Sequence, residues 1–280
     1  MTSSQILPSR RSFLRTSLAT AAATSWLPAI TTGKDSNKKG LCSALRNPAR
    51  LKTLQDLQVD WVYTWAGKRP DKLPASIDFF PMIWGYWGKP EKIKQTANRA
   101  KKAGIDTMLG FNEPDGKKQA NLSVEKALKA WPHLVETELR LGSPACKQPD
   151  NDWMKKFMSE TKRKDLRVDF VCVHSYGGTD AKAFLKRMDR IHKLYRKPIW
   201  ITEFAVGDWQ AKNVQQNRHK PDQVLKFMEK VLPGLQKRDY IEKFAWFPPS
   251  PSHKNLGTSA LYKNNGQLTK LGEFYRDFED

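Results

Sequence analysis

The sequence predicts an α/β fold, a single (β/α)8 (TIM) barrel, from three observations. The chain has 280 residues, a length that suits one barrel domain. Eight short runs rich in apolar residues are separated by stretches in which apolar residues recur at helical spacing. Some runs, such as residues 168–174 and 198–204, are almost continuously apolar, as parallel strands covered on both faces are. We therefore assign residues 39–280 to one barrel domain.

The predicted strands and helices alternate along the chain. The strands comprise residues 40–44, 59–65, 79–84, 107–112, 141–143, 168–174, 198–204 and 241–247. One helix is expected to begin at Pro90 and to stop at Gly104, because Pro is favoured at helix starts and Gly just past helix ends. Two further helices are indicated by apolar stripes over residues 184–194 and 224–235.

The loops predict which end of the barrel carries a site. The connections from helix to strand are short, whereas three connections from strand to helix are long and lack a helical stripe. These long loops are residues 66–78, 207–220 and 248–260. Because barrel sites lie at the C-terminal ends of the strands, we expect a cleft at that face.

Residues 1–30 predict an export signal rather than a part of the fold. Arg10 and Arg11 precede Phe13, Leu14 and a short stretch of small apolar residues, the pattern of a bacterial twin-arginine signal peptide. An amphipathic N-terminal helix is the alternative. Residues 31–38 are polar and aperiodic and predict a linker. We therefore expect a periplasmic or secreted protein.

The composition excludes several classes of protein. Only 39% of the residues are hydrophobic, and no interior run is apolar enough to span a bilayer, which argues against an integral membrane protein. Cys42, Cys146 and Cys172 are too few for a disulfide scaffold and lack metal-ligand spacing. Neither a P-loop nor a GxGxxG sequence is present. We expect no cofactor, no metal and a monomeric chain.

The charge is strongly basic. The formal net charge is +20, and the isoelectric point is about 9.8. Nucleic-acid binding is not expected, because the basic residues are spread along helices rather than grouped with aromatic residues. Two interpretations stay open. The lysines form a solvated surface, or the partner is an anionic surface or an acidic or sulfated polysaccharide.

Two predicted strands end in a glutamate at matching positions. Glu113 closes the fourth strand in the sequence LGFNEPD, and Glu203 closes the seventh in PIWITEF. A carboxylate at the end of an apolar strand costs desolvation free energy, so two of them indicate a function. Cleavage of a glycosidic bond needs such a pair, one protonated carboxyl group and one ionised carboxylate. Pairing of one glutamate with a lysine at the rim is the alternative.

Nine segments between Lys39 and Tyr275 carry a family resemblance. They are KGL, VYTW, PMIWG, LGFNEPD, LGSPA, VDFVCVHSYG, PIWITEF, FAWF and LYKNNGQLTKLGEFY. In combination they resemble glycoside hydrolase family 128, the alkali-sensitive-linkage type of glycosyl hydrolase in clan A. The resemblance implies a retaining enzyme that acts mainly on β-1,3-glucans, with Glu113 as the general acid/base and Glu203 as the nucleophile.

The implied reaction is a double displacement. Glu203 attacks the anomeric carbon while Glu113 protonates the leaving oxygen, and Glu113 then activates water as a base. This requires carboxyl groups about 5–5.5 Å apart, against about 6.5–9.5 Å in inverting enzymes. Asn112 is expected to hydrogen-bond the sugar 2-hydroxyl; a simple turn residue before Pro114 is the alternative.

Further side chains are expected around the substrate. Tyr176 and His174 end the sixth strand, so either can donate a hydrogen bond to Glu203, and His174 can instead hold a sugar hydroxyl or simply belong to the core. Trp246 ends the eighth strand, and its indole is suited to stacking on a sugar ring. Three more tryptophans end or follow the second and third strands and are expected to line the same cleft: Trp65, Trp84 and Trp87.

Two classes of function remain. The first is an endo-acting hydrolase of β-1,3-glucan or of a related β-glycan, and the second is a glucan-binding protein of the same fold with little or no turnover. The sequence favours the hydrolase, because a binding protein does not need both Glu113 and Glu203. In either class the expected partner is a polysaccharide, a β-glucan or an anionic glycan.

Overall fold

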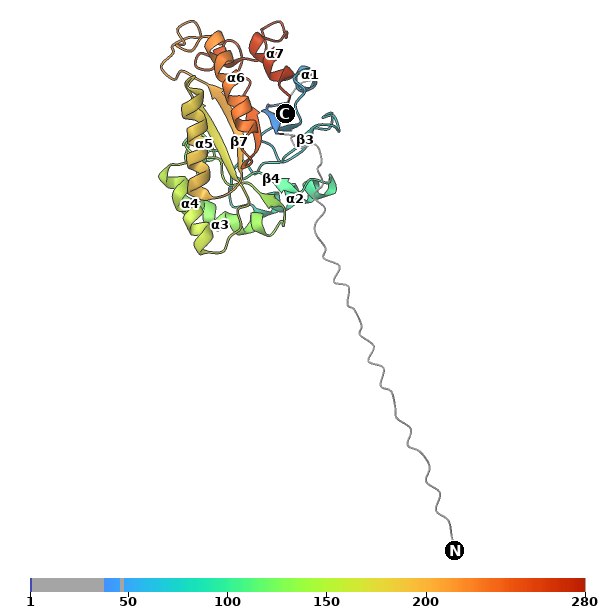
Figure 1. The fold of residues 1–280 in the computed structure, drawn as a ribbon. Coiled ribbons are helices and arrows are strands. Elements are labelled where there is room, and N and C mark those ends of the chain that lie inside the picture. Colours follow the sequence, from blue (N-terminus) through green and yellow to red (C-terminus); the bar gives the residue numbers. More distant parts are fainter. Residues whose placement is uncertain (2–37, 46–47, 280) are drawn as a thin grey trace. The chain divides into compact units, whose positions relative to one another are not determined.

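The computed structural model describes Met1 and residues 38–45 and 48–279 (Figure 1). The predicted signal peptide and all but the last residue of the predicted linker fall on residues 2–37, outside this described part. Ser36–Asp280 forms one compact unit, and its described residues contain all the elements below.

The described chain contains eight parallel strands, and a helix lies between consecutive strands except between β2 and β3, which confirms the predicted barrel. The strands are β1 (Lys39–Cys42), β2 (Trp61–Tyr63), β3 (Asp78–Phe79), β4 (Thr107–Met108), β5 (Arg140–Leu141), β6 (Val171–Gly177), β7 (Ile199–Val206) and β8 (Ile241–Trp246). Six pair in the order β3-β2-β1-β8-β7-β6, and β4 pairs with β5. Single parallel bridges, Met82 to Leu109 and Gly142 to Phe170, join the two groups and close the ring.

The helices pack outside the strands, with α5 beside α6 along β7 (Figure 1). They are α1 (Pro48–Asp56), α2 (Pro90–Lys102), α3 (Val124–Val135), α4 (Asp152–Arg163), α5 (Ala181–Tyr195), α6 (Pro221–Gln236) and α7 (Lys270–Asp277), with a 3-10 turn, η1 (Gly257–Ser259). The three helices predicted from the sequence are α2, α5 and α6. Gly104 follows α2 with φ +71°, the left-handed conformation that favours glycine.

Aromatic rings fill the N-terminal end of the barrel interior. Trp61 and Trp200 are buried. The Trp200 ring centroid lies 4.3 Å from that of Phe170 and 4.7 Å from that of Phe80. Gly40 on β1 leaves room for the Trp61 indole, since a Cβ atom there would lie 2.2 Å from Trp61 Cε2. Because these rings fill the N-terminal end of the barrel, a cleft can form only at the opposite end, where the strands have their C-terminal ends.

The structure also bears on the cysteines and on membrane-spanning segments. All three cysteines are buried and free, and Cys172 belongs to the barrel interior. In the part of the chain that the structure describes, no helix combines the length and apolarity needed to cross a membrane.

Candidate active site

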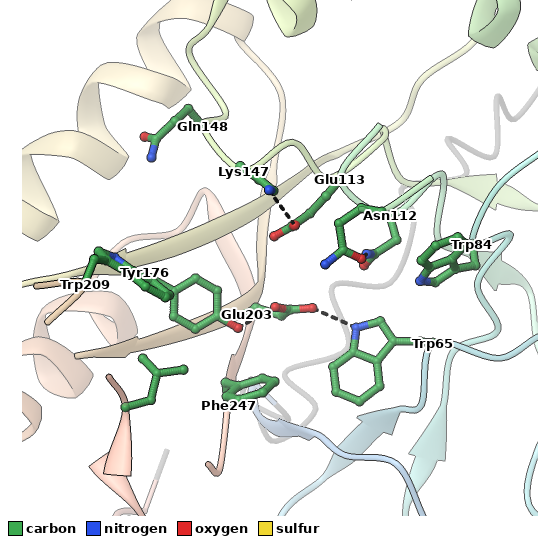
Figure 2. A pocket seen from close by; sticks show the side chains of 12 residues that line it. Trp65, Trp84, Asn112, Glu113, Lys147, Gln148, Tyr176, Glu203, Trp209 and Phe247 are labelled. Atoms are coloured by element: carbon green, nitrogen blue, oxygen red, sulfur yellow. Dashed lines mark hydrogen bonds and ion pairs between the residues drawn. The ribbon is translucent and has the colours of Figure 1, made fainter. Parts of the chain in front are cut away.

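A cavity of about 620 Å³ opens at the C-terminal ends of the strands and contains both strand-end glutamates (Figure 2). We call it the cleft. Its lining side chains are Trp65, Trp84, Asn112, Glu113, Gln119, Lys147, Gln148, Tyr176, Glu203, Trp209, Phe247 and Leu256. Aromatic and polar side chains are thus mixed around two carboxylates, the composition expected of a site for a polar ligand with apolar faces.

A β-bulge aims Glu203 into the cleft. Val173 on β6 pairs with Ile201 on β7. The next residue of β6, His174, pairs with Glu203, so Thr202 is an extra residue in β7. Bulges redirect side chains near sites. The Glu203 side chain is only 7% exposed, and the bulge sets it opposite His174.

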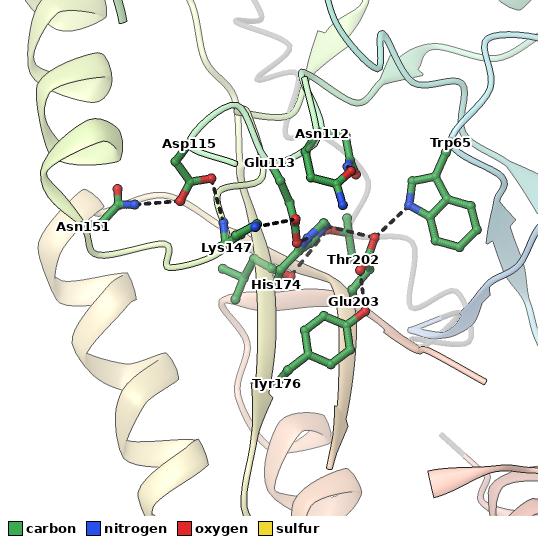
Figure 3. Close-up of polar contacts among 12 residues, drawn as sticks. Trp65, Asn112, Glu113, Asp115, Lys147, Asn151, His174, Tyr176, Thr202 and Glu203 are labelled. Atoms are coloured by element: carbon green, nitrogen blue, oxygen red, sulfur yellow. Dashed lines mark hydrogen bonds and ion pairs between the residues drawn. The ribbon is translucent and has the colours of Figure 1, made fainter. Parts of the chain in front are cut away.

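Three side chains donate hydrogen bonds to the Glu203 carboxylate, and two of them, Trp65 and Tyr176, are labelled in Figure 3. The Tyr63 hydroxyl and the Trp65 indole N–H reach Oε1 at 2.7 Å and 2.8 Å, and the Tyr176 hydroxyl donates to Oε2. Burial and the nearby Glu203 charge raise the pKa of Tyr63 and of Tyr176 well above its usual value, so both hydroxyls stay protonated. The donors orient the carboxylate and stabilise its negative charge.

Glu113 is held in an uncommon backbone conformation. Its φ of +39° is in the left-handed region, where non-glycine residues are rare and cluster at functional sites. Its amide N–H donates to the Ala145 carbonyl at 2.7 Å, and the side chain is 12% exposed. Lys147 Nζ lies 4.0 Å from Oε2. The Lys147 backbone N–H donates to Asp115 at 3.1 Å, which fixes this loop beside Glu113.

His174 lies between the two glutamates (Figure 3). Its Nδ1 is 3.2 Å from Glu113 Oε1, and its Nε2 is 3.3 Å from Glu203 Oε1. Burial acts to lower the pKa of His174, but the Glu203 charge and the hydrogen bond and charge of Glu113 outweigh it and raise that pKa. In the protonated ring both nitrogens are donors, one toward each carboxylate. The hydrogen bond of His174 is with Glu113 rather than with Glu203 as predicted. Its Nε2 faces Glu203 at ion-pair distance and makes no hydrogen bond among the described residues.

These three side chains also have the spacing of a metal site. One ligand atom from each of Glu113, His174 and Glu203 lies within 4.8 Å of the other two. Carboxylate oxygen and imidazole nitrogen can bind several divalent metals. Both ring nitrogens already face carboxylate oxygens, which favours a hydrogen-bonded network over coordination.

The predicted aromatic residues divide into three groups. Trp65 and Trp84 line the cleft, and the Trp65 N–H also binds Glu203. Trp87 lies outside it, stacked on Trp84 with ring centroids 5.9 Å apart. The prediction for Trp246 is wrong. Its ring is buried, packs 4.9 Å from the Phe204 ring centroid and donates its N–H to a backbone carbonyl.

Several cleft residues were missed by the sequence analysis. Phe247, one residue after Trp246, lines the cleft, because successive side chains of a strand point to opposite faces. Tyr63 is buried beneath the cleft and binds Glu203. It lies two residues after the interior residue Trp61 and therefore points to the same side of β2, which the period of a strand indicates. Trp209 comes from the long loop after β7 and was not predicted either, although a tryptophan in a long loop at this face of the barrel indicates a binding site.

Trp246→Ala is expected to destabilise the fold by about 3–5 kcal/mol, because it opens a cavity in the core. Urea unfolding measures the loss, with Trp209→Ala as the control because Trp209 is exposed. A Trp246→Ala variant as stable as the unaltered protein would show that its ring is not part of the core.

The comparisons with known proteins agree with this geometry. The model of the family described as glycosyl hydrolase catalytic core matches residues 37–275. Alkali-sensitive linkage protein 1 of Schizosaccharomyces pombe is 30% identical over 229 residues, which is 78% of this chain. The matched part is 40% of that relative's length, so the chain spans less than half of it.

Solved structures are also similar. One is a subgroup I endo-β-1,3-glucanase of glycoside hydrolase family 128 from Amycolatopsis mediterranei in complex with laminaritriose. It is 32% identical with a TM-score of 0.73, over 86% of this chain and 99% of that chain. Another is a curdlan-specific exo-β-1,3-glucanase, subgroup III, from Blastomyces gilchristii, 27% identical with a TM-score of 0.67, over 86% and 98%. By sequence and by fold, the chain belongs to the glycosyl hydrolase catalytic core family, as a member of glycoside hydrolase family 128.

Proposed function

We propose that the protein is a retaining glycoside hydrolase that cleaves β-1,3-glucan. The observation that carries the proposal is the pair of carboxylates, Glu113 and Glu203, which approach within 4.8 Å at the base of an aromatic-lined cleft. Retaining pairs stand about 5–5.5 Å apart and inverting pairs about 6.5–9.5 Å, so the separation favours retention. The substrate class rests on the similar β-1,3-glucanases from Amycolatopsis and Blastomyces.

The roles of the two glutamates follow from their surroundings. Glu203 accepts three hydrogen bonds that orient the carboxylate, which suits the nucleophile that attacks the anomeric carbon. Glu113 lies on the opposite side of His174 and accepts none of these three hydrogen bonds, so it is the carboxyl group left to protonate the leaving oxygen. It then takes a proton from the water that cleaves the glycosyl-enzyme.

Asn112 is suited to hold the sugar next to the bond that breaks. Its amide N–H donates to Gln119 Oε1 at 3.2 Å, whereas its Oδ1 is buried and has no donor among the described residues. A buried acceptor of this kind is costly unless a ligand satisfies it. We assign it to the sugar 2-hydroxyl, a contact that strengthens in the transition state.

Hydrolysis of laminarin tests the proposal. We expect reducing ends to appear with laminarin and not with β-1,4-glucan, and proton NMR to detect β-configured product first. An α-configured first product would contradict retention. Binding of laminarin without any release of reducing ends, from laminarin or from a panel of other β-glycans, would make the protein a glucan-binding relative of these enzymes.

Tyr176→Phe is expected to lower kcat about 10- to 100-fold, since a hydrogen bond to a charged group is worth about 1.5–3 kcal/mol. The variant keeps the ring and removes only the hydroxyl that binds Glu203. Tyr195→Phe is the matched control, because the Tyr195 hydroxyl donates to the Pro149 carbonyl, away from the cleft. Equal kcat values for the two variants would show that the Tyr176 hydroxyl does not contribute to catalysis.

We also propose that the protein is exported, on the twin-arginine pattern at Arg10 and Arg11. Replacing both arginines with lysine should leave the protein in the cytoplasm of a bacterial host, as cell fractionation would show. An unchanged distribution would contradict the proposal.

A further inference from the structure

A second cavity, of about 510 Å³, lies beside the cleft. We call it the basic groove and define it by the lining residues Trp87, Lys117, Gln119, Lys126 and Lys129. Gln119 lines both cavities. Trp87 lines the groove and stacks on Trp84 of the cleft with an angle of 10° between the rings. The two cavities are therefore neighbours on one surface, and a chain molecule can occupy both.

Trp87 gives the groove an aromatic surface. Its side chain is 64% exposed, although tryptophan is among the residues that gain most from burial. Its ring is held nearly parallel to Trp84 rather than free to turn. A rigid, exposed indole beside a glycan cleft is suited to stacking on the apolar face of a further sugar unit.

Three lysines give the groove its charge. Lys117, Lys126 and Lys129 are exposed, and no ion pair is found for any of them among the described residues. Lys126 and Lys129 stand three residues apart on α3, so they share one face of the helix. No acidic side chain lines the groove. The positive charges of these three lysines are therefore available to bind a ligand.

The nearest acidic residue on α3 is already occupied. Glu125 is next to Lys126 in the chain, but it accepts a hydrogen bond at 2.6 Å from Lys156 on α4. That bond lowers the pKa of Glu125 to about 2. The carboxylate is therefore paired away from the groove lysines.

We propose that the basic groove binds a sugar unit carrying an anionic group, such as a sulfate, carboxylate or phosphate, on the same glycan chain that enters the cleft. The inference rests on the proposed function, because it takes the cleft to hold a β-glycan. Trp87 stacks on the sugar ring, and the three lysines bind the anion. A glycan is favoured over a nucleic acid because the groove continues a cleft built around two carboxylates, which repel a phosphate backbone.

Binding to two matched ligands tests the inference. The ligands are a neutral β-1,3-glucan hexasaccharide and the same hexasaccharide carrying carboxymethyl or sulfate groups, each titrated calorimetrically. We expect the anionic ligands to bind about tenfold more tightly at low salt, and this preference to disappear at high salt, because exposed charges are screened. Replacing Lys117, Lys126 and Lys129 with Gln should abolish the preference.

The control removes the same charge elsewhere. Lys186, Lys226 and Lys230 are exposed on α5 and α6, and their replacement with Gln should keep the preference. The titrations use the Glu203→Gln background, so binding is read even if the unaltered protein hydrolyses no glucan. No preference for anionic ligands, or its equal loss in both triple variants, would overturn the inference. Tighter binding of a single-stranded oligonucleotide to the groove would overturn it as well.

Discussion

Glu203→Gln is expected to reduce the hydrolysis of β-1,3-glucan by about 10³-fold or more, as the loss of a catalytic nucleophile does. Glutamine has nearly the same shape but cannot form the covalent bond to the anomeric carbon. Tyr63, Trp65 and Tyr176 donate to both oxygens of the carboxylate. Glutamine has only one acceptor oxygen, so its NH2 group would face one of these donors. The measurement is the release of reducing ends from laminarin.

The partner variant separates the two roles. Removing the general acid/base Glu113 as Glu113→Ala should cost about 10²- to 10⁴-fold, and less with an aryl glucoside whose leaving group needs no proton. Azide should then restore turnover and give a β-glycosyl azide. Glu229→Gln on the exposed side of α6 is the control and should retain full activity. Formation of the β-glycosyl azide by a Glu203 variant, with the α-glycosyl azide formed by Glu113→Ala, would exchange the assigned roles.

The fold was predictable because it depends on repeating patterns. Eight apolar runs recur along the chain, with helical stripes between several of them, and this alternation is sufficient to indicate a closed parallel barrel. Strand lengths were less predictable. β4 and β5 contain only two residues each, and the ring closes there through single bridges. Such bridges depend on the curvature of the barrel, and curvature produces no periodic pattern of apolar residues in the sequence.

The site was predictable to within one residue along each strand, and that limit explains the error at Trp246. The eighth strand was expected to end at residue 247, which is close to the observed end at Trp246. Since side chains alternate between the two faces, choosing the neighbour selects the wrong aromatic residue. The bulge at Thr202 is similar, because no residue pattern marks an inserted residue in an apolar run.

Removing the imidazole of His174 should have a second large effect on activity. His174→Phe keeps a ring of similar size but leaves two carboxylates within 4.8 Å of each other without a cation between them. One of them is then expected to take up a proton, since like charges at this distance disfavour ionisation. Together with misplacement of the carboxylates, this should lower kcat/KM at neutral pH about 100-fold. His174→Gln, which keeps a donor, should lose less.

The same residue should link stability to pH. The pKa of His174 in the folded protein is raised above its ordinary value of 6.5, so the folded protein binds this proton more tightly than the unfolded chain. The resulting stabilisation is fully present below pH 6.5 and is lost as the pH rises through the folded pKa. Urea unfolding between pH 5 and 9 should therefore show this decline in the unaltered protein and not in His174→Phe. If the unfolding free energies of the unaltered protein and of His174→Phe changed with pH in the same way, His174 would have the same pKa in the folded and unfolded states. The proposed imidazolium between the two carboxylates would then be contradicted.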